Sequence, residues 1–268
     1  MSIPIIVLHH QDDCAEVALF GAHVLSYKKA GSEKLFVSKS AKLDGSRPIR
    51  GGIPVCWPWF GQLHPAIKEH GIAHGLVRNQ MWQITAQIQT NTMASVTLEP
   101  TVTRHTLWPE GLSCQIKITL TDTLKIELVT HNSSNIPYPL SAALHTYFTV
   151  PDISTTAVTG VTGAFTNNLD STLHMTCPEP YVFTEETDRV HQSTTHKTTI
   201  ETNGNTLHTV EHQGHDSLVI WNPWQTKAAS FVDMEDTEYQ KFVCIETALT
   251  QGYVIQPGQT QILVQVIR

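Results

Sequence analysis

The chain has few positive charges for its length. Its 268 residues include 17 lysines and arginines against 24 aspartates and glutamates, which gives a formal net charge of -7. This balance argues against nucleic acid or an anionic membrane as the main partner, because both bind clustered lysine and arginine. Long apolar runs are also missing, and no stretch approaches the roughly 20 residues of a membrane-spanning helix. The N-terminus carries no basic leader and no small-residue cleavage site, so we expect a cytoplasmic protein.

Cysteine is scarce, and no C-x-x-C motif is present. The five cysteines are widely scattered: Cys14, Cys56, Cys114, Cys177 and Cys244. We expect them to be reduced thiols. Histidine is frequent, and His70 and His74 have the four-residue separation of some zinc ligands. However, Gly71 and Gly75 interrupt that segment and the H-E-x-x-H motif is absent, so we expect no metal.

Convincing helical periodicity, internal repeats and low-complexity linkers are also missing. Short β-branched runs separated by turn residues are present instead, at 95–102, 113–121, 124–131, 217–221, 241–247 and 261–268. They predict an all-β protein, an antiparallel sandwich or barrel, with one domain over residues 1–268. We expect the polar, threonine-rich stretch 184–206 to be a surface loop with strand ends.

One segment has an unusual composition. Residues 49–61 (IRGGIPVCWPWFG) hold two prolines, two tryptophans and, at the front edge, Arg50. Each proline removes a backbone donor, so the segment fits neither a regular helix nor a central strand. We expect a rigid loop whose tryptophans, Trp57 and Trp59, lie in the core or form a surface on which a sugar stacks.

Two ionisable residues fall within apolar, strand-like runs, where ionisation is costly. His145 shares one face of its predicted strand with Tyr147, and Glu246 shares a face with Cys244. A poorly solvated carboxyl group has a raised pKa, which suits a general base working near neutral pH. Each also has an ordinary explanation, as a hydrogen-bonded core histidine or a glutamate paired with arginine. Asp216, just ahead of another strand-like run, is a third candidate or simply a turn residue.

Six motifs together carry a family resemblance. In chain order they are RGGIPVCWPWFG, HGLVRNQMW, SAALHTYFTV, TDRVH, DSLVIWNPW and FVCIETA. In this set and order the sequence resembles the hexose-6-phosphate mutarotase branch of the aldose 1-epimerase family, over nearly the whole chain. The resemblance implies a large antiparallel β-supersandwich of the galactose mutarotase type, with few short helices.

The resemblance also implies a reaction, the exchange of the α and β anomers of a hexose 6-phosphate by ring opening and closure. His145 matches the family's general acid, and Glu246 matches its general base. A carboxylate near His145 would keep the imidazole protonated. This chemistry calls for neither a metal nor a cofactor.

Other matches imply how the substrate is held. His74 matches a histidine that contacts sugar hydroxyls, and Asp216 matches an acidic residue that binds the sugar. Arg50 and Arg78 match arginines that hold the substrate phosphate, for which a planar guanidinium offers a fork of donors. The aromatic rings of the 49–61 loop would stack on the apolar faces of the sugar ring.

One position departs from the family pattern. His191 follows TDRV, where an aromatic residue, usually tyrosine, is expected. We expect this change to affect local packing or the edge of the pocket. The expected partner is a small-molecule sugar phosphate, bound by a monomer. The alternative is a non-catalytic carbohydrate or sugar-phosphate binding protein, although a pure binder has no need for His145 and Glu246 within apolar runs.

Overall fold

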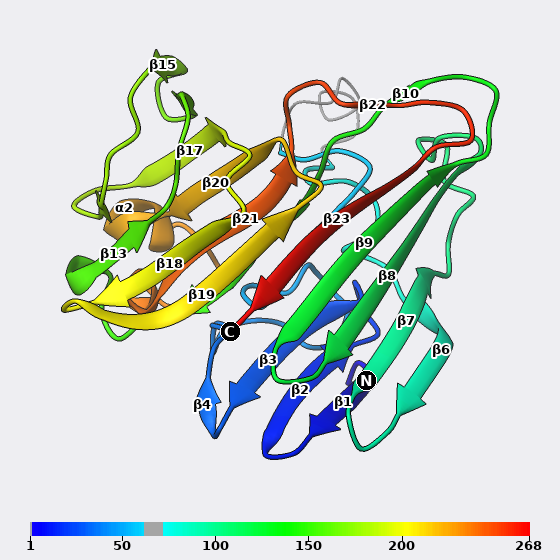
Figure 1. Cartoon of the computed structure of the whole chain (residues 1–268), viewed down its shortest axis with the longest axis horizontal. Helices are drawn as coiled ribbons and strands as arrows, with labels where there is room; N and C mark the ends of the chain where they lie inside the picture. The colour runs from blue at the N-terminus through cyan, green and yellow to red at the C-terminus, as the bar shows by residue number, and fades with distance from the viewer. Residues whose placement is uncertain (1, 62–71) are drawn as a thin grey trace.

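The computed structural model describes residues 2–61 and 72–268, and almost all regular structure in these residues is β-strand. Within them, Figure 1 shows a broad nine-stranded sheet, an eight-stranded sheet beside it and a four-stranded sheet formed by the N-terminal strands. Neighbouring strands run antiparallel. The expected antiparallel β-supersandwich is confirmed.

The nine-stranded sheet alternates between buried and more exposed residues. Along β8 and β9 every second side chain is buried, as in a sheet with one face on the core. Its strands lie, among the described residues, in the order β16 (Tyr181–Val182), β13 (Thr156–Thr159), β18 (Lys197–Thr202), β19 (Asn205–Gln213), β23 (Thr260–Ile267), β9 (Leu124–Asn132), β8 (Leu112–Leu120), β7 (Ala94–Pro100) and β6 (Trp82–Gln89).

The eight-stranded sheet contains the most deeply buried strand, β21, which is buried along its whole length. β21 and β11 contact β23 of the nine-stranded sheet, so the two large sheets pack against each other there. The strands described lie in the order β15 (Thr172–His174), β14 (Phe165–Asn167), β17 (Thr187–Gln192), β20 (Ser217–Asn222), β21 (Phe242–Leu249), β11 (Ala142–Leu144) and β5 (Val55–Cys56), and β12 (Tyr147–Thr149) also pairs with β21.

Smaller elements complete the described structure. The four-stranded sheet contains β1 (Ile5–His10), β2 (Asp13–Ala18), β3 (His23–Lys29) and β4 (Ser32–Glu33), and β10 (Tyr138–Pro139) pairs with β22 (Val254–Ile255). Its helical segments are short: η1 (Ile153–Thr155), α2 (Trp224–Ala228) and η2 (Glu238–Lys241). A search of the described part of the chain finds no helix with the length and apolar character needed to span a membrane.

The strand predictions agree with the structure except at one place. Each of the six predicted runs forms a strand: β7, β8, β9, β20, β21 and β23. The prediction of a loop over 184–206 is wrong, because β17 and β18 occupy much of it. Threonine favours strands, and the buried hydroxyl of Thr198 is satisfied by Nε2 of His212 at 2.9 Å. All five cysteines are unpaired, as expected.

Buried histidines give the fold a predictable response to acid. Burial lowers the pKa of His23, His191 and His208 to about 4 in each case. The unfolded chain, with ordinary histidine pKa values near 6.5, binds more protons than the folded chain between these two values. We therefore expect the free energy of unfolding to fall from pH 6.5 toward pH 4, by about 1.2 kcal/mol per pH unit per histidine near pH 5. Burial raises the pKa of Glu246 and of Asp188, which act in the opposite direction but are two groups against these three.

Urea unfolding at a series of pH values measures this slope. The His208→Gln variant keeps a donor for the carbonyl of Thr149, which Nε2 of His208 contacts at 2.7 Å, but cannot be protonated. We expect it to flatten the slope by about 1.2 kcal/mol per pH unit near pH 5. His9→Gln, at an exposed position, serves as the control. A His208→Gln slope equal to that of the wild type would contradict the explanation.

Candidate active site

Strand pairing brings two of the predicted residues together from distant parts of the chain. β21 pairs with β11 through Leu144 and with β12 through Tyr147. This register places Glu246 of β21 opposite His145, which lies between β11 and β12. Nδ1 of His145 and Oε1 of Glu246 are 3.3 Å apart. The imidazole and the carboxyl group therefore face each other, as the sequence-based hypothesis requires.

The His145–Glu246 pair is poorly solvated, with 12% and 1% of the two side chains exposed. Burial lowers the pKa of His145 well below its ordinary value, and nearby histidine and arginine side chains act in the same direction. Burial raises the pKa of Glu246 well above its ordinary value, and Asp188 adds to the rise. These directions oppose the expectation that the carboxylate keeps His145 protonated. Burial favours the neutral form of both the imidazole and the carboxyl group.

Arg50 lies on the wall of the same cleft, but its charge is already paired. Its Nε donates to Oδ1 of Asp233 at 3.2 Å, and its Nη1 donates to the hydroxyl of Tyr147 at 3.2 Å. Its Cζ also lies 4.3 Å from the ring centroid of Phe231. Arg50 thus has fewer free donors than the sequence-based hypothesis supposed.

Two glycines fix the direction of the loop that carries Arg50. Gly51 and Gly52 have φ of 109° and 62°, in the region that favours glycine. A Cβ on either residue would lie 2.3 Å from a backbone oxygen, that of Phe36 or that of Val24. Nε2 of His23 donates to the carbonyl of Gly51 at 2.7 Å. The loop is therefore bound closely to its neighbours, and the expectation of a rigid loop agrees with this packing.

His74 enters the cleft from a tight turn. Its φ of 61° is left-handed, and the following Gly75 has a φ of 79°. A Cβ on Gly75 would lie 2.0 Å from the carbonyl oxygen of Trp57, so no other residue fits there. Nδ1 of His74 accepts the N–H of Gly61 at 3.3 Å, and burial lowers the pKa of His74 to about 3. The neutral ring thus carries its proton on Nε2, where it can be donated to a ligand.

Arg78 is a partly buried cation without a carboxylate partner in the described part of the chain. None of the ion pairs there includes it. Its Nη2 donates to the carbonyl of Ala73 at 2.9 Å, whereas its buried Nε has no partner. Burial lowers the pKa of Arg78 from its ordinary high value. Since a poorly solvated charge without an ion-pair partner is unfavourable, this guanidinium favours an anion in the cleft.

These side chains line two adjoining chambers. The first, of about 320 Å³, is lined by residues that include Arg47, Arg50, Arg78, Tyr147 and Asp233. The second, of about 650 Å³, is lined by residues that include Phe60, Asp188, Trp221, Lys227 and Glu246. Arg50, His74, Arg78 and His145 border both chambers.

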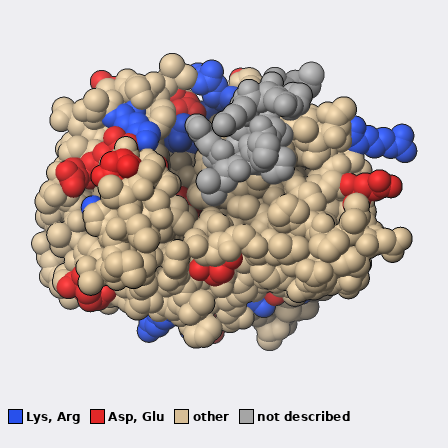
Figure 2. All heavy atoms as spheres, turned by 90° about the horizontal axis from the view of Figure 1, so that it is seen from above, with Lys and Arg blue, Asp and Glu red and all other residues tan. Residues whose placement is uncertain are grey.

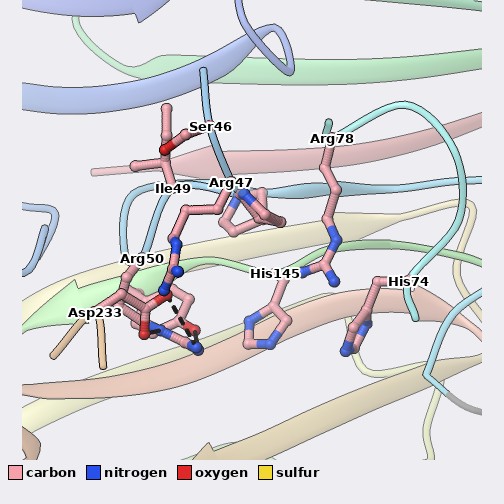
Figure 3. A pocket seen from close by; sticks show the side chains of 11 residues that line it. Ser46, Arg47, Ile49, Arg50, His74, Arg78, His145 and Asp233 are labelled. Carbon is pink, nitrogen blue, oxygen red and sulfur yellow. Dashed lines mark hydrogen bonds and ion pairs between the residues drawn. The ribbon is translucent and has the colours of Figure 1, made fainter. Parts of the chain in front are cut away.

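Figure 3 shows His145 between the Arg50–Asp233 pair and His74, with Arg78 directed toward the space between the two histidines. Side chains of both charges gather around a hollow on the face shown in Figure 2.

Asp216 lies outside both chambers, so its predicted contact with the sugar is wrong. Its Oδ1 accepts the N–H of Thr250 at 2.8 Å and the hydroxyl of Ser217 at 2.8 Å. Its Oδ2 accepts the N–H of Gln251 at 3.3 Å. These contacts fix the loop that follows β21, which is the role of a turn residue.

Asp188 supplies a carboxyl group in the cleft that the sequence reasoning missed. It lies on β17 and lines the larger chamber together with Val190, two residues further along. Burial raises the pKa of Asp188, and its Oδ1 accepts a hydrogen bond from Nδ2 of Asn168 at 2.8 Å. The signal was present in the TDRVH motif, whose alternation puts Asp188 and Val190 on one face.

The aromatic residues of the cleft also differ from those expected. Trp57 and Trp59 are buried in the core, and their Nε1 atoms donate to Oγ1 of Thr130 and the carbonyl of Ile72, both at 3.0 Å. The expectation that a sugar stacks on them is therefore wrong. From the 49–61 loop, Phe60 lines the larger chamber instead, and Trp221 of β20 lines it as well.

Of the other histidines noted in the sequence, one lies in the core away from the two chambers, and one lies outside the described residues. His191 is fully buried, and its Nε2 lies 2.9 Å from the hydroxyl of Tyr181. It faces away from the chamber that Asp188 and Val190 line, so its effect is on packing. His70 lies outside the described residues.

Comparisons with known proteins agree with this fold. The family model described as "Aldose 1-epimerase" matches residues 4–268. A protein of Escherichia coli K12 named "Putative glucose-6-phosphate 1-epimerase" is 34% identical over 251 residues, which are 92% of this chain and 83% of the relative. A protein of Salmonella typhimurium with the same name is 32% identical over 266 residues, 96% of this chain and 85% of the relative.

A solved structure extends the similarity to three dimensions. It is described as a "putative mutarotase" from Salmonella typhimurium, superimposes with a TM-score of 0.90 at 30% identity, and covers 99% of this chain and 90% of that chain. Fold, site and relatives together define a sugar mutarotase. The chain belongs to the aldose 1-epimerase family.

Proposed function

We propose that this mutarotase interconverts the α and β anomers of a hexose 6-phosphate. The observation that carries the proposal is the arginine-lined chamber directly beside the His145–Glu246 pair. Arg78 has a charge without a carboxylate partner in the described residues, and the exposed Arg47 lines the same chamber. A phosphate dianion would compensate these charges, while the sugar ring occupies the larger chamber.

The larger chamber suits a sugar ring. Phe60 and Trp221 offer apolar surface for its C–H faces, and the polar groups between them can bind its hydroxyls. In this arrangement His74 donates through Nε2, and Asp188 binds a ring hydroxyl. Glu246 and His145 then contact C1–OH and the ring oxygen respectively.

Ring opening needs one proton removed and one supplied. Glu246, as carboxylate, takes the proton of the C1 hydroxyl, and His145, as imidazolium, protonates the ring oxygen as the C1–O5 bond breaks. The open-chain aldehyde is then accompanied by a protonated Glu246 and a neutral His145. Rotation about C1–C2 presents the other carbonyl face, and the same transfers in reverse close the ring. The single proton of the pair returns to its starting position.

Substrate charge supports this cycle. The structure favours the neutral pair, which is the form that accompanies the open chain. A phosphate beside Arg50 and Arg78 would offset the positive charges that lower the pKa of His145, and so favour its protonation. Hydrogen bonds from sugar hydroxyls would stabilise the Glu246 carboxylate. The phosphate therefore assists the proton transfer as well as the binding.

The test compares anomer exchange on glucose 6-phosphate and on glucose, followed by saturation-transfer NMR with the spontaneous rate subtracted. We expect kcat/KM to be at least about 10²-fold higher for the phosphorylated sugar, because each guanidinium–phosphate hydrogen bond contributes about 1.5–3 kcal/mol. Inorganic phosphate is expected to inhibit competitively. Equal kcat/KM values for the two sugars would refute the preference for a phosphate.

A further inference from the structure

A buried polar cluster lies directly behind the acid–base pair. Thr146 follows His145 in the chain, and Thr247 follows Glu246 on β21. Gln265 lies on β23 of the nine-stranded sheet. All three side chains are fully buried where the two large sheets pack together. Because buried polar groups are costly unless they are hydrogen-bonded, such a cluster within an otherwise apolar core calls for an explanation.

The amide of Gln265 joins both catalytic segments. Its Nε2 donates to the carbonyl of Ile245 at 3.2 Å and to Oγ1 of Thr247 at 2.9 Å. Its Oε1 accepts the hydroxyl of Thr146. Only an NH₂ group can face the carbonyl of Ile245, so this contact fixes the orientation of the amide. One side chain thus contacts residues on both sides of Glu246 and the residue after His145.

These contacts of Gln265 with Thr146, Ile245 and Thr247, which we call the Gln265 brace, lie where the strand ladder is interrupted. β11 ends at Leu144 and β12 begins at Tyr147, so His145 and Thr146 lie between the two strands. The backbone there forms a long contact, from the N–H of Ile245 to the carbonyl of Thr146 at 3.3 Å. The side-chain contacts of Gln265 therefore add to the backbone pairing at the point where it is interrupted.

The cluster continues away from the site. Nδ1 of His212 lies 2.8 Å from Oγ1 of Thr247, and its Nε2 lies 2.9 Å from Oγ1 of Thr198. Burial lowers the pKa of His212 to about 3, so the imidazole stays neutral. Since Thr247 accepts from Gln265, its hydroxyl can donate to Nδ1 of His212, which leaves Nε2–H to donate to Thr198. Each hydrogen bond then has one donor and one acceptor.

We propose that Gln265, with the hydroxyls of Thr146 and Thr247, positions the imidazole of His145 against the carboxyl group of Glu246. These are positioning residues, because they lie on the opposite face of the strands and do not line the chambers. The inference rests on the catalytic roles proposed above for His145 and Glu246. Displacement of a reacting group by about 1 Å can lower a rate by about 10²-fold, so a loosened brace acts on kcat.

Paired substitutions separate the hydroxyl from the volume it fills. Thr247→Val and Thr146→Val keep the shape and remove the hydrogen bond, whereas Thr247→Ser and Thr146→Ser keep it. We expect each valine variant to lower kcat for anomer exchange by about 10- to 100-fold with KM within about threefold, and each serine variant to stay within about threefold of wild type. Thr156→Val is the matched control. Thr156 lies on β13, away from the catalytic segments, and its buried hydroxyl donates to the carbonyl of Asp152 at 2.7 Å.

Two further measurements separate the effect on the site from other effects. Thermal unfolding and KM distinguish a loosened site from a loosened fold, and Glu246→Gln measured alongside reports on the catalytic assignment itself. Valine variants with wild-type kcat beside an inactive Glu246→Gln would overturn the brace alone, as would equal losses in valine and serine variants. An active Glu246→Gln would instead overturn the proposed acid–base roles. If Thr247→Val does not fold, Thr146→Val tests the same connection from the other segment.

Discussion

Replacement of Glu246 by glutamine is expected to lower kcat for anomer exchange by about 10²- to 10⁴-fold. Glutamine has the shape of the glutamate side chain but cannot take the C1 hydroxyl proton. The side chain is 1% exposed and lies 3.3 Å from Nδ1 of His145, so no bulk water can replace it as a base. The loss should appear in kcat, because the carboxyl group acts on the proton that moves in the transition state.

Anomer exchange of glucose 6-phosphate measures this effect, after subtraction of the spontaneous rate. Glu110→Gln is the matched control, since Glu110 is exposed and remote from both chambers. Its kcat should equal that of the wild type. The base assignment is wrong if Glu246→Gln keeps more than about a third of the wild-type kcat.

His145 and Glu246 are expected to act as a unit, and a double variant tests this. His145→Asn alone should lower kcat by a similar factor, because the ring oxygen then lacks its acid. The double variant should lose little more than either single variant. Two groups that act on the same bond-breaking step work as a unit, and their losses do not multiply. Multiplied losses would show that each group acts independently.

Strand existence could be predicted from the sequence, but strand register could not. Alternation of apolar and polar residues correctly marked β8 and β9, and a continuous apolar run marked β21. The two-residue period also put His145 on the same face as Tyr147. It did not show that Glu246 lies opposite His145. That pairing depends on which strands neighbour β21, and this is decided by packing across the whole sheet rather than by any local pattern.

The dependence of pairing on the whole fold also explains the errors in the predicted site. Asp216 precedes an apolar run, whereas Asp188 lies in a polar stretch, and only the fold shows that Asp188 lines the chamber while Asp216 binds backbone N–H groups. Arg50 was correctly placed at the cleft, but its partner Asp233 is 183 positions away in the chain. The tryptophans of the 49–61 loop are buried in the core, which composition alone does not reveal.

Replacement of Arg78 by glutamine is expected to lower kcat/KM for glucose 6-phosphate by about 10²-fold while free glucose changes by less than about threefold. Arg78 borders both chambers and has no ion-pair partner among the described residues. Its charge is thus available to the substrate phosphate. Glutamine keeps much of the side-chain length and a donor for the carbonyl of Ala73, so the turn that carries His74 should be retained.

Stability distinguishes Arg78 from Arg50. Removal of a partly buried charge without an ion-pair partner should leave the free energy of unfolding of Arg78→Gln unchanged or raise it. Arg50→Gln should lower it by about 1–3 kcal/mol, because Asp233 is then left buried without its partner. If Arg78 serves the substrate rather than the fold, its replacement should lower substrate binding without lowering the free energy of unfolding.

The measurements are kcat/KM for the two sugars and urea unfolding at pH 7, with exposed Arg104→Gln as the control for loss of one positive charge. Equal losses of Arg78→Gln on glucose and glucose 6-phosphate would mean that Arg78 supports the ring or the turn rather than the phosphate. The combination expected here, selective loss of activity without loss of stability, follows only if the charge of Arg78 is uncompensated until substrate binds. The phosphate preference and the cost of the buried guanidinium are then two consequences of the same arrangement.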